Sequence, residues 1–141
     1  MSIPTHLRLE FVTPERAIAH EEVDELHLPG EEGYFGVLPG HAPLLAALAT
    51  GEMWYRRGTD VQYAFIDGGI AEVLPDRVSI MAQVAERAED IDIQRAEAAK
   101  LRAEDVLSKP SAADADAERT RIAMLRAIAR MNVARRSRTH R

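Results

Sequence analysis

Two arginines near the carboxyl end of the chain, Arg126 and Arg130, stand four positions apart in a stretch of strong helix formers. Residues with this spacing lie on one face of a helix, so their guanidinium groups share that face. Each guanidinium can donate two aligned, charge-assisted hydrogen bonds to phosphate or carboxylate oxygens. The pair therefore suits a phosphate-bearing ligand or an acidic surface. The alternative is that these arginines are simply solvated on an exposed helix.

The sequence lacks the residue patterns that common catalytic sites need. The glycine-rich string at 30–40 is not followed by the Gly-Lys-Ser/Thr of a P-loop. There is also no Gly-x-Ser-x-Gly elbow, no His-Glu-x-x-His zinc helix and no Rossmann fingerprint. The five histidines stand far apart, and the absence of cysteine excludes disulfides, thiolate metal sites and thiol nucleophiles. We expect a non-catalytic protein of a reducing compartment, with no metal site and no required cofactor.

Charge is divided unevenly along the 141 residues. Residues 1–90 carry 6 basic and 16 acidic side chains, whereas residues 91–141 carry 12 basic and 7 acidic ones. This split favours docking of the two parts on each other, or an acidic or phosphate-bearing partner for the basic part. The pI near 5.5 and the few aromatic residues argue against nucleic-acid binding. The longest aliphatic run, Leu44 to Ala49, is too short for a membrane span of about 20 residues, so no direct membrane insertion is expected.

The first 86 residues show the period-two alternation of half-buried strands. Leu7, Leu9 and Phe11, for example, alternate with polar residues, and similar short runs are separated by glycine and proline. Gly58-Thr59-Asp60 predicts a tight hairpin, and Gly68-Gly69 is expected to interrupt a strand. Seven or more short strands at close spacing indicate an all-β sandwich or barrel over residues 1–86.

Residues 87–141 have the pattern of a two-helix hairpin. Asp90 is a candidate N-cap for a helix from Ile91 to Ser108, Pro110 follows it, and a second helix is expected from about Asp114 to Arg136. Each helix has one apolar stripe, formed by Ile93, Ala96, Ala99, Ala103 and Val106 in the first and by Ile122, Leu125, Ala129 and Val133 in the second. Small side chains bury little apolar area, at about 25 cal/mol per Å². We therefore expect a weakly held hairpin that can move.

Three segments together carry a family resemblance: Gly33-Tyr34-Phe35-Gly36-Val37-Leu38-Pro39-Gly40-His41-Ala42-Pro43-Leu44-Leu45, Gly68-Gly69-Ile70-Ala71-Glu72-Val73 and Ile91-Asp92-Ile93-Gln94-Arg95-Ala96. In order and content they resemble the epsilon subunit of bacterial rotary ATP synthases, almost from end to end. The resemblance implies a β-sandwich of about ten strands and then a helical hairpin. It also implies a non-catalytic place in the central rotor stalk of a proton-translocating enzyme, beside the gamma subunit and on the c-ring. That position is peripheral, at the cytoplasmic face of the bacterial inner membrane.

The resemblance also carries site residues onto this sequence. The c-ring and gamma interface it implies consists of Glu32, Gly33, Gly36, Pro39, Gly40 and His41, on a loop stiffened by its prolines. Tyr34 stands where some relatives have an acid. The segment from Ile91 to Ala96 accompanies ATP binding in some members. The regulatory ATP site it implies consists of Glu86, Asp92, Arg95, Ala96, Arg102, Arg126 and Arg130. A simple Asp92–Arg95 pair within the helix is the competing interpretation.

The mechanism expected from these features is a switch of the hairpin between a compact state on the β domain and an extended state. In the extended state the arginines would engage the alpha and beta catalytic subunits and inhibit ATP hydrolysis. ATP bound only to the compact state would stabilise that state. The principal alternative is an independent adaptor whose basic hairpin binds an unrelated acidic protein or RNA. An enzyme with an unrecognised polar pocket is a weaker alternative.

Overall fold

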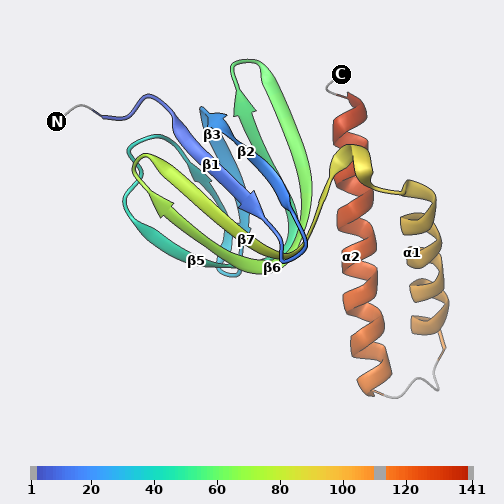
Figure 1. Cartoon of the computed structure of the whole chain (residues 1–141). Coiled ribbons are helices and arrows are strands. Elements are labelled where there is room, and N and C mark those ends of the chain that lie inside the picture. The colour runs from blue at the N-terminus through green and yellow to red at the C-terminus, as the bar shows by residue number, and fades with distance from the viewer. Residues whose placement is uncertain (1–2, 110–113, 140–141) are drawn as a thin grey trace.

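The computed structural model describes residues 3–109 and 114–139, with the backbone alone for residues 114, 115 and 137–139 (Figure 1). Its elements in chain order are β1 (Leu7–Val12), β2 (Ala17–Val23), β3 (Glu25–Gly30), β4 (Gly33–Val37), β5 (Leu44–Arg57), β6 (Asp60–Leu74), β7 (Arg77–Arg87), the 3₁₀ helix η1 (Ala88–Asp90), α1 (Ile93–Leu107) and α2 (Asp114–Thr139). A β domain, called the head below, thus precedes two helices, as the sequence pattern predicts.

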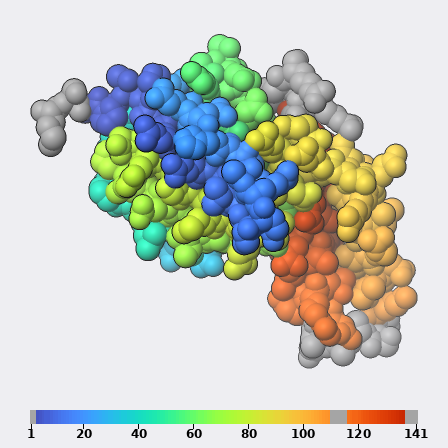
Figure 2. Space-filling view, in the orientation of Figure 1, coloured from blue at the N-terminus to red at the C-terminus, as the bar shows by residue number. Residues whose placement is uncertain are grey.

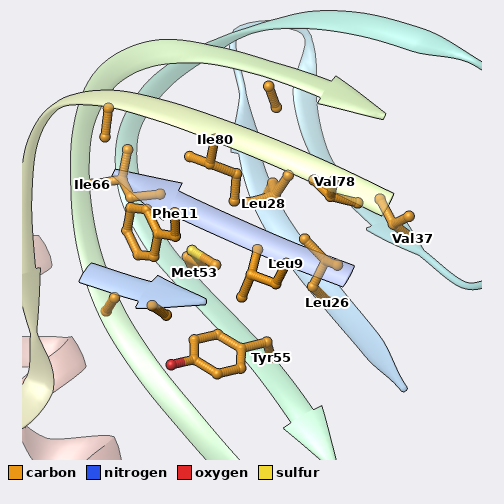
Figure 3. Close-up of a cluster of buried hydrophobic side chains, with 14 of the residues drawn as sticks. Leu9, Phe11, Leu26, Leu28, Val37, Met53, Tyr55, Ile66, Val78 and Ile80 are labelled. Atoms are coloured by element: carbon orange, nitrogen blue, oxygen red, sulfur yellow. The ribbon is translucent and has the colours of Figure 1, made fainter. Parts of the chain in front are cut away.

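The strands of the head form one hydrogen-bonded sheet in the order β2-β1-β7-β6-β5-β3-β4. Strand β1 runs parallel to β7, and the other neighbours are antiparallel. The sheet folds over on itself as a sandwich, so that side chains of both layers meet in one core (Figure 3). Leu9 and Phe11 of β1, Leu26 of β3 and Met53 of β5 are all fully buried there. The alternation seen at Leu7, Leu9 and Phe11 is therefore confirmed as an inward face.

The described residues contain seven strands, fewer than the ten or so that the resemblance implies. The difference arises because β5, β6 and β7 are 14, 15 and 11 residues long and each runs as one continuous strand. The expected interruption at Gly68-Gly69 is wrong: Asp67 pairs with Val84 and Gly69 with Ala82 in one unchanged register, while both glycines have positive φ. Pairing with β5 on one side and β7 on the other carries β6 through the two glycines. The hairpin turn at Gly58 is confirmed, since Arg57 pairs with Asp60 across it.

The first helix begins two residues later than expected. Asp90 is the last residue of η1, and Asp92 is the N-cap of α1, its carboxylate accepting a hydrogen bond from the Arg95 backbone N–H at 3.1 Å. Capping by Asp at this position satisfies one of the free N–H groups of the first turn. The prediction of Asp90 as N-cap is therefore wrong, because Asp90 is part of η1 and α1 is capped two residues later, by Asp92.

Helix α2 lies between the head and α1, as Figure 1 shows, and the hairpin projects beyond the head in Figure 2. A second apolar cluster joins the head to the hairpin and contains Tyr63 and Phe65 of β6 with Val133 and Ala134 of α2. The predicted stripe of α2 is only partly right, because Leu125 is 61% exposed. Because α2 packs against the head on one side and α1 on the other, its buried residues lie on two faces, and a single apolar stripe does not describe them.

The seam between the two helices is built from small residues, as expected. Ala96 and Ala103 of α1 and Ala127 of α2 are buried, as is Met131 one turn after Ala127, while Leu101 of α1 is 65% exposed. At about 25 cal/mol per Å², three alanine side chains contribute little to the free energy of docking. Contacts between α2 and the head therefore decide where the hairpin lies.

Candidate functional site

A cavity of about 430 Å³ lies where the end of β7, the η1 connection and the two helices meet. It is lined by Val84, Glu86, Asp90, Asp92, Arg95, Ala96, Ala99, Arg102, Ala123, Ala127 and Arg130. Each element supplies a part: β7 brings Glu86, the first three turns of α1 bring Arg95 and Arg102, and α2 brings Arg130. The fold thus gathers into one cavity six of the seven residues assigned to an ATP site by resemblance.

The lining of this cavity combines three guanidinium groups with three carboxylates and four alanines. Arg130 is fixed on two sides: its Nε donates to Glu86 Oε1, and its guanidinium carbon lies 4.4 Å from the centroid of the Phe65 ring. The carboxylate of Asp92 caps α1, so the interpretation of Asp92 and Arg95 as a side-chain ion pair is replaced by a capping bond to the Arg95 backbone. Arg95 and Arg102 are exposed side chains on the cavity wall.

Arg126 is absent from the described lining of the cavity. Its Nε lies 2.6 Å from Oδ2 of Asp67, the residue of β6 that precedes Gly68 and Gly69. The other oxygen of that carboxylate, Oδ1, accepts a hydrogen bond from the Thr50 hydroxyl at 2.6 Å. The two arginines four positions apart therefore share a helix face, as predicted, but contact different carboxylates of the head.

A third arginine of α2 also contacts the head. Arg136 Nη2 lies 2.9 Å from Glu52 Oε1. The acceptors form a pattern on the sheet, because Glu52 pairs with Phe65 and Phe65 pairs with Glu86 across β5, β6 and β7. Two carboxylates thus flank the fully buried ring of Phe65 in one cross-strand row. The docking surface of the head is an apolar centre with an acidic rim, and α2 supplies the matching arginines.

The cavity has the size and chemistry for a phosphate-bearing ligand. Small-molecule sites commonly enclose about 300 to 1,000 Å³. Guanidinium groups converge on it from α1 and α2 and could hold phosphate oxygens, while the alanines offer a flat apolar wall for a ring. The carboxylates could accept hydrogen bonds from hydroxyl or amino groups. No group of three or more His, Cys, Asp or Glu side chains within residues 3–109 and 114–139 is arranged to hold a metal ion.

The second set of predicted contact residues lies on the head, away from this cavity. The string at 33–45, expected as a stiff loop, contains the edge strand β4, so Glu32 and His41 stand on either side of that strand. Both ends are tied down: Glu31 N–H donates to Ala47 O at 2.9 Å, and Gly40 N–H donates to Pro75 O at 2.8 Å. The expectation of a rigid edge is met by these bonds, although the chain reaches it as a strand between two turns.

Along this edge, Glu32, Gly33, Gly36 and Gly40 are exposed, and Pro39 and His41 are half-buried. The φ angle of Gly40 is 86°, in the left-handed region that favours glycine. The Tyr34 hydroxyl accepts a hydrogen bond from the Glu52 N–H at 3.2 Å, so its ring leans across the sheet while 63% of the residue stays exposed. A largely exposed edge with a fixed backbone is suited to a docking contact.

Two side chains of the head have pKa values displaced by their surroundings, and neither lines the cavity. The Gly58 N–H bond, with a smaller contribution from His6, lowers the pKa of Asp24. Burial raises the pKa of Tyr55 to about 12, because the phenolate would lose its hydration. The Tyr55 side chain lies in the core, while the ring of its chain neighbour Trp54 stacks on His27 with centroids 4.2 Å apart.

Comparison with known proteins gives a family for this architecture. Residues 6–88 match the family described as "ATP synthase, Delta/Epsilon chain, beta-sandwich domain", and residues 89–135 match "ATP synthase, Delta/Epsilon chain, long alpha-helix domain". The chain belongs to the epsilon subunit family of bacterial F-type ATP synthases. It is similar to the ATP synthase epsilon chain of Nitratidesulfovibrio vulgaris strain DP4, with 47% identity covering 90% of this chain and 94% of the relative. It is also 46% identical to that of Solibacter usitatus, covering 94% and 98%.

Solved structures agree with this membership. A chain of the Euglena gracilis mitochondrial ATP synthase, in a structure of OSCP, F1 and c-ring, superposes with a TM-score of 0.81 and 25% identity over 91% of this chain and 81% of that one. A chain from the Tetrahymena thermophila central stalk and c-ring, at 15% identity and a TM-score of 0.60, shares the fold. This epsilon subunit is therefore a non-catalytic subunit of the central stalk. Neither helix of its described part is long and apolar enough to cross a membrane.

Sequence reasoning missed several residues that the structure brings to the hairpin contact. Asp67, Thr50 and Glu52 lie 59, 76 and 84 positions before the arginines they serve, so local spacing could not connect them. One signal was present: acidic residues dominate the first part of the chain and basic residues the second. The prediction that the two parts dock on each other rested on that signal, and the three arginine contacts agree with it.

Proposed function

We propose that this epsilon subunit regulates the F1 sector through its hairpin. In the compact state described above, α2 rests on the head. In an extended state, the hairpin reaches the alpha and beta subunits and blocks ATP hydrolysis. The observation that carries the proposal is the composition of the docking surface: three arginine–carboxylate contacts around a small apolar cluster. Such a surface can be exchanged for another acidic one, because arginine can make the same paired hydrogen bonds to a new carboxylate.

The proposal includes ATP as a regulatory ligand of the compact state. The cavity exists only while α1, α2 and β7 are together, since each contributes lining residues. A ligand that binds only the compact state stabilises it by about 2.7 kcal/mol at 100 times its Kd, roughly a hundredfold shift in population. Arg130 would then share its guanidinium between Glu86 and a phosphate. Arg126 can join the site only by leaving Asp67.

The proposal places the subunit between gamma and the c-ring, peripheral to the cytoplasmic face of the bacterial inner membrane. The edge formed by Glu32, Gly33, Gly36, Pro39, Gly40 and His41 is the proposed contact with the c-ring and gamma. Its exposure and its backbone bonds support that role. The alternative of an independent adaptor loses its main support, because the matches cover 90% or more of both this chain and the relatives named above.

Removing the hairpin tests the inhibitory role. An assembled ATP synthase whose epsilon chain ends before Ile91 is expected to hydrolyse ATP faster than the intact complex. The control is the amount of truncated epsilon retained in the purified complex, because loss of the whole subunit would also change the rate. An unchanged ATPase rate in a complex that retains the truncated chain would refute inhibition by the hairpin.

Calorimetry on the isolated full-length subunit tests ATP binding. Arg102→Gln and Arg130→Gln change cavity residues and are each expected to weaken ATP binding by about tenfold, the loss of one charge-assisted contact. Arg121→Gln, on an exposed part of α2 outside the cavity lining, is the matched control and should bind as the unmodified chain does. Arg126→Gln distinguishes whether Arg126 joins the site. Equal heats for all four variants would remove the arginines from the proposal.

A further inference from the structure

The contact between Asp67 and Arg126 differs from the other arginine contacts in how firmly its acceptor is held. The Asp67 side chain is 15% exposed, whereas Arg126 is 45% exposed, so the carboxylate is fixed in the sheet and the arginine approaches from its rim. The Thr50 hydroxyl, on the paired strand β5, holds one carboxylate oxygen at 2.6 Å. The second oxygen, Oδ2, is thereby left to accept the contact from Arg126.

The backbone that follows Asp67 also fixes this position. Gly68 and Gly69 have φ angles of 77° and 135°, which side chains rarely allow. A Cβ atom on Gly69 would lie 2.3 Å from the Met81 carbonyl oxygen and 2.7 Å from Ala82 Cα, so β7 leaves no room for one. This close packing of β6 on β7 helps to hold Asp67 in place on the face of the sheet that α2 covers.

We propose that Asp67 and Arg126 form a latch that holds the hairpin on the head without nucleotide, separate from the cavity one helical turn away. The two arginines one helical turn apart have different roles: Arg126 holds the compact state, and Arg130 lines the ligand site. This inference rests on the proposed switching of the hairpin for its regulatory meaning. Its physical content, that one oriented carboxylate controls release of α2, stands without ATP or the assembled enzyme.

The cost of breaking the latch follows from the asymmetry of the pair. An exposed ion pair contributes little, because solvent replaces it. A mostly buried carboxylate that loses its cation does not regain full hydration, and hydrogen bonds to charged groups contribute more than neutral ones. We expect loss of the pair to lower the ratio of docked to released α2 by about tenfold, and loss of the Thr50 hydroxyl alone to lower it by about threefold.

Native-state hydrogen exchange of the full-length chain, without nucleotide, tests the latch because it measures rare opening of one segment against the rest. Asp67→Asn keeps the shape and the acceptor for Thr50 but removes the charge. Exchange of the α2 amides is expected to rise about tenfold, with head amides unchanged, and Thr50→Val should give about threefold. Glu72→Gln is the matched control, an exposed carboxylate on the same strand, and should leave α2 exchange unchanged.

Arg126→Gln breaks the latch from the helix side, so the test does not depend on the head tolerating a change at Asp67. Its effect should equal that of Asp67→Asn, and the double variant should add nothing further, as expected for two partners of one contact. Additive effects, or an Asp67→Asn exchange pattern like that of Glu72→Gln, would overturn the latch. ATP calorimetry and ATPase rates play no part in this readout, so a latch that opens as expected in a chain that neither binds ATP nor inhibits would contradict only the proposed function.

Discussion

Replacing Val133 with alanine should release the hairpin while leaving the head intact. Val133 is fully buried and packs in the cluster with Tyr63 and Phe65 of the head. Two buried carbons at about 0.8 kcal/mol each, with a small cavity term, give a loss of about 2 kcal/mol. Alanine is the better helix former by about 0.5 kcal/mol, which offsets part of this loss. The net cost of about 1.5 kcal/mol corresponds to roughly a tenfold lower ratio of docked to released α2.

The chain carries its own optical probe for this measurement. Trp54 is the single tryptophan, and it packs against the cluster that Val133 completes. Release of α2 should shift its emission to longer wavelength at urea concentrations below those that unfold the head. Leu125→Ala is the matched control: it removes more carbon from the same helix, but at a residue that is 61% exposed, and should change the ratio by less than about twofold.

Two results would refute this reasoning. If Val133→Ala lowered the stability of the head and the hairpin together, α2 would be part of the head's cooperative unit. If Val133→Ala and Leu125→Ala behaved alike, the apolar cluster would contribute nothing measurable to docking.

Three further outcomes follow from the geometry. The pKa of Tyr55 is about 12 in the folded chain and about 10 in the unfolded chain. The free energy of unfolding should therefore fall as pH rises from about 10 to about 12, because the unfolded chain loses this proton first. Urea titrations should show the fall, and Tyr55→Phe should abolish it. Gly69→Ala, which meets β7 backbone, should destabilise the head by at least about 2 kcal/mol, against about 1 kcal/mol for Gly58→Ala in an open turn, measured by thermal unfolding. Asp92→Ala should weaken α1 by about 1 kcal/mol in amide exchange, whereas Asp90→Ala should not.

The parts of the fold that depend on local pattern could be predicted from the sequence. Alternation at Leu7, Leu9 and Phe11 marks the inward face of β1, and a run of helix-forming residues before Pro110 marks α1, because period and propensity are local properties; the N-cap was expected at Asp90, two residues before its actual place at Asp92. Continuity of the long strands could not be predicted from the glycines. The Gly68-Gly69 pair predicts a break, yet pairing with β5 and β7 carries β6 through it in an unchanged register.

For the candidate site, too, one part could be predicted from the sequence and another could not. Six cavity residues were predictable once the family resemblance supplied them, and their convergence depends on a hairpin that the sequence does indicate. The separate contact of Arg126 was not predictable, because its partner Asp67 lies on a strand distant in sequence and is positioned by Thr50. Arg126 and Arg130 point from the same face of α2, but the part of the head that each one meets decides which of them lines the cavity.

The offset between helix and head has a mechanical consequence. Helix α2 has 26 residues, or about 39 Å at 1.5 Å per residue, and its contacts with the head described above begin only at Arg126. The stretch before Arg126 is therefore a lever arm of roughly 18 Å that overhangs the head (Figure 2). A force applied at that end of the hairpin therefore acts through this arm on the contacts made by Arg126, Arg130 and Arg136.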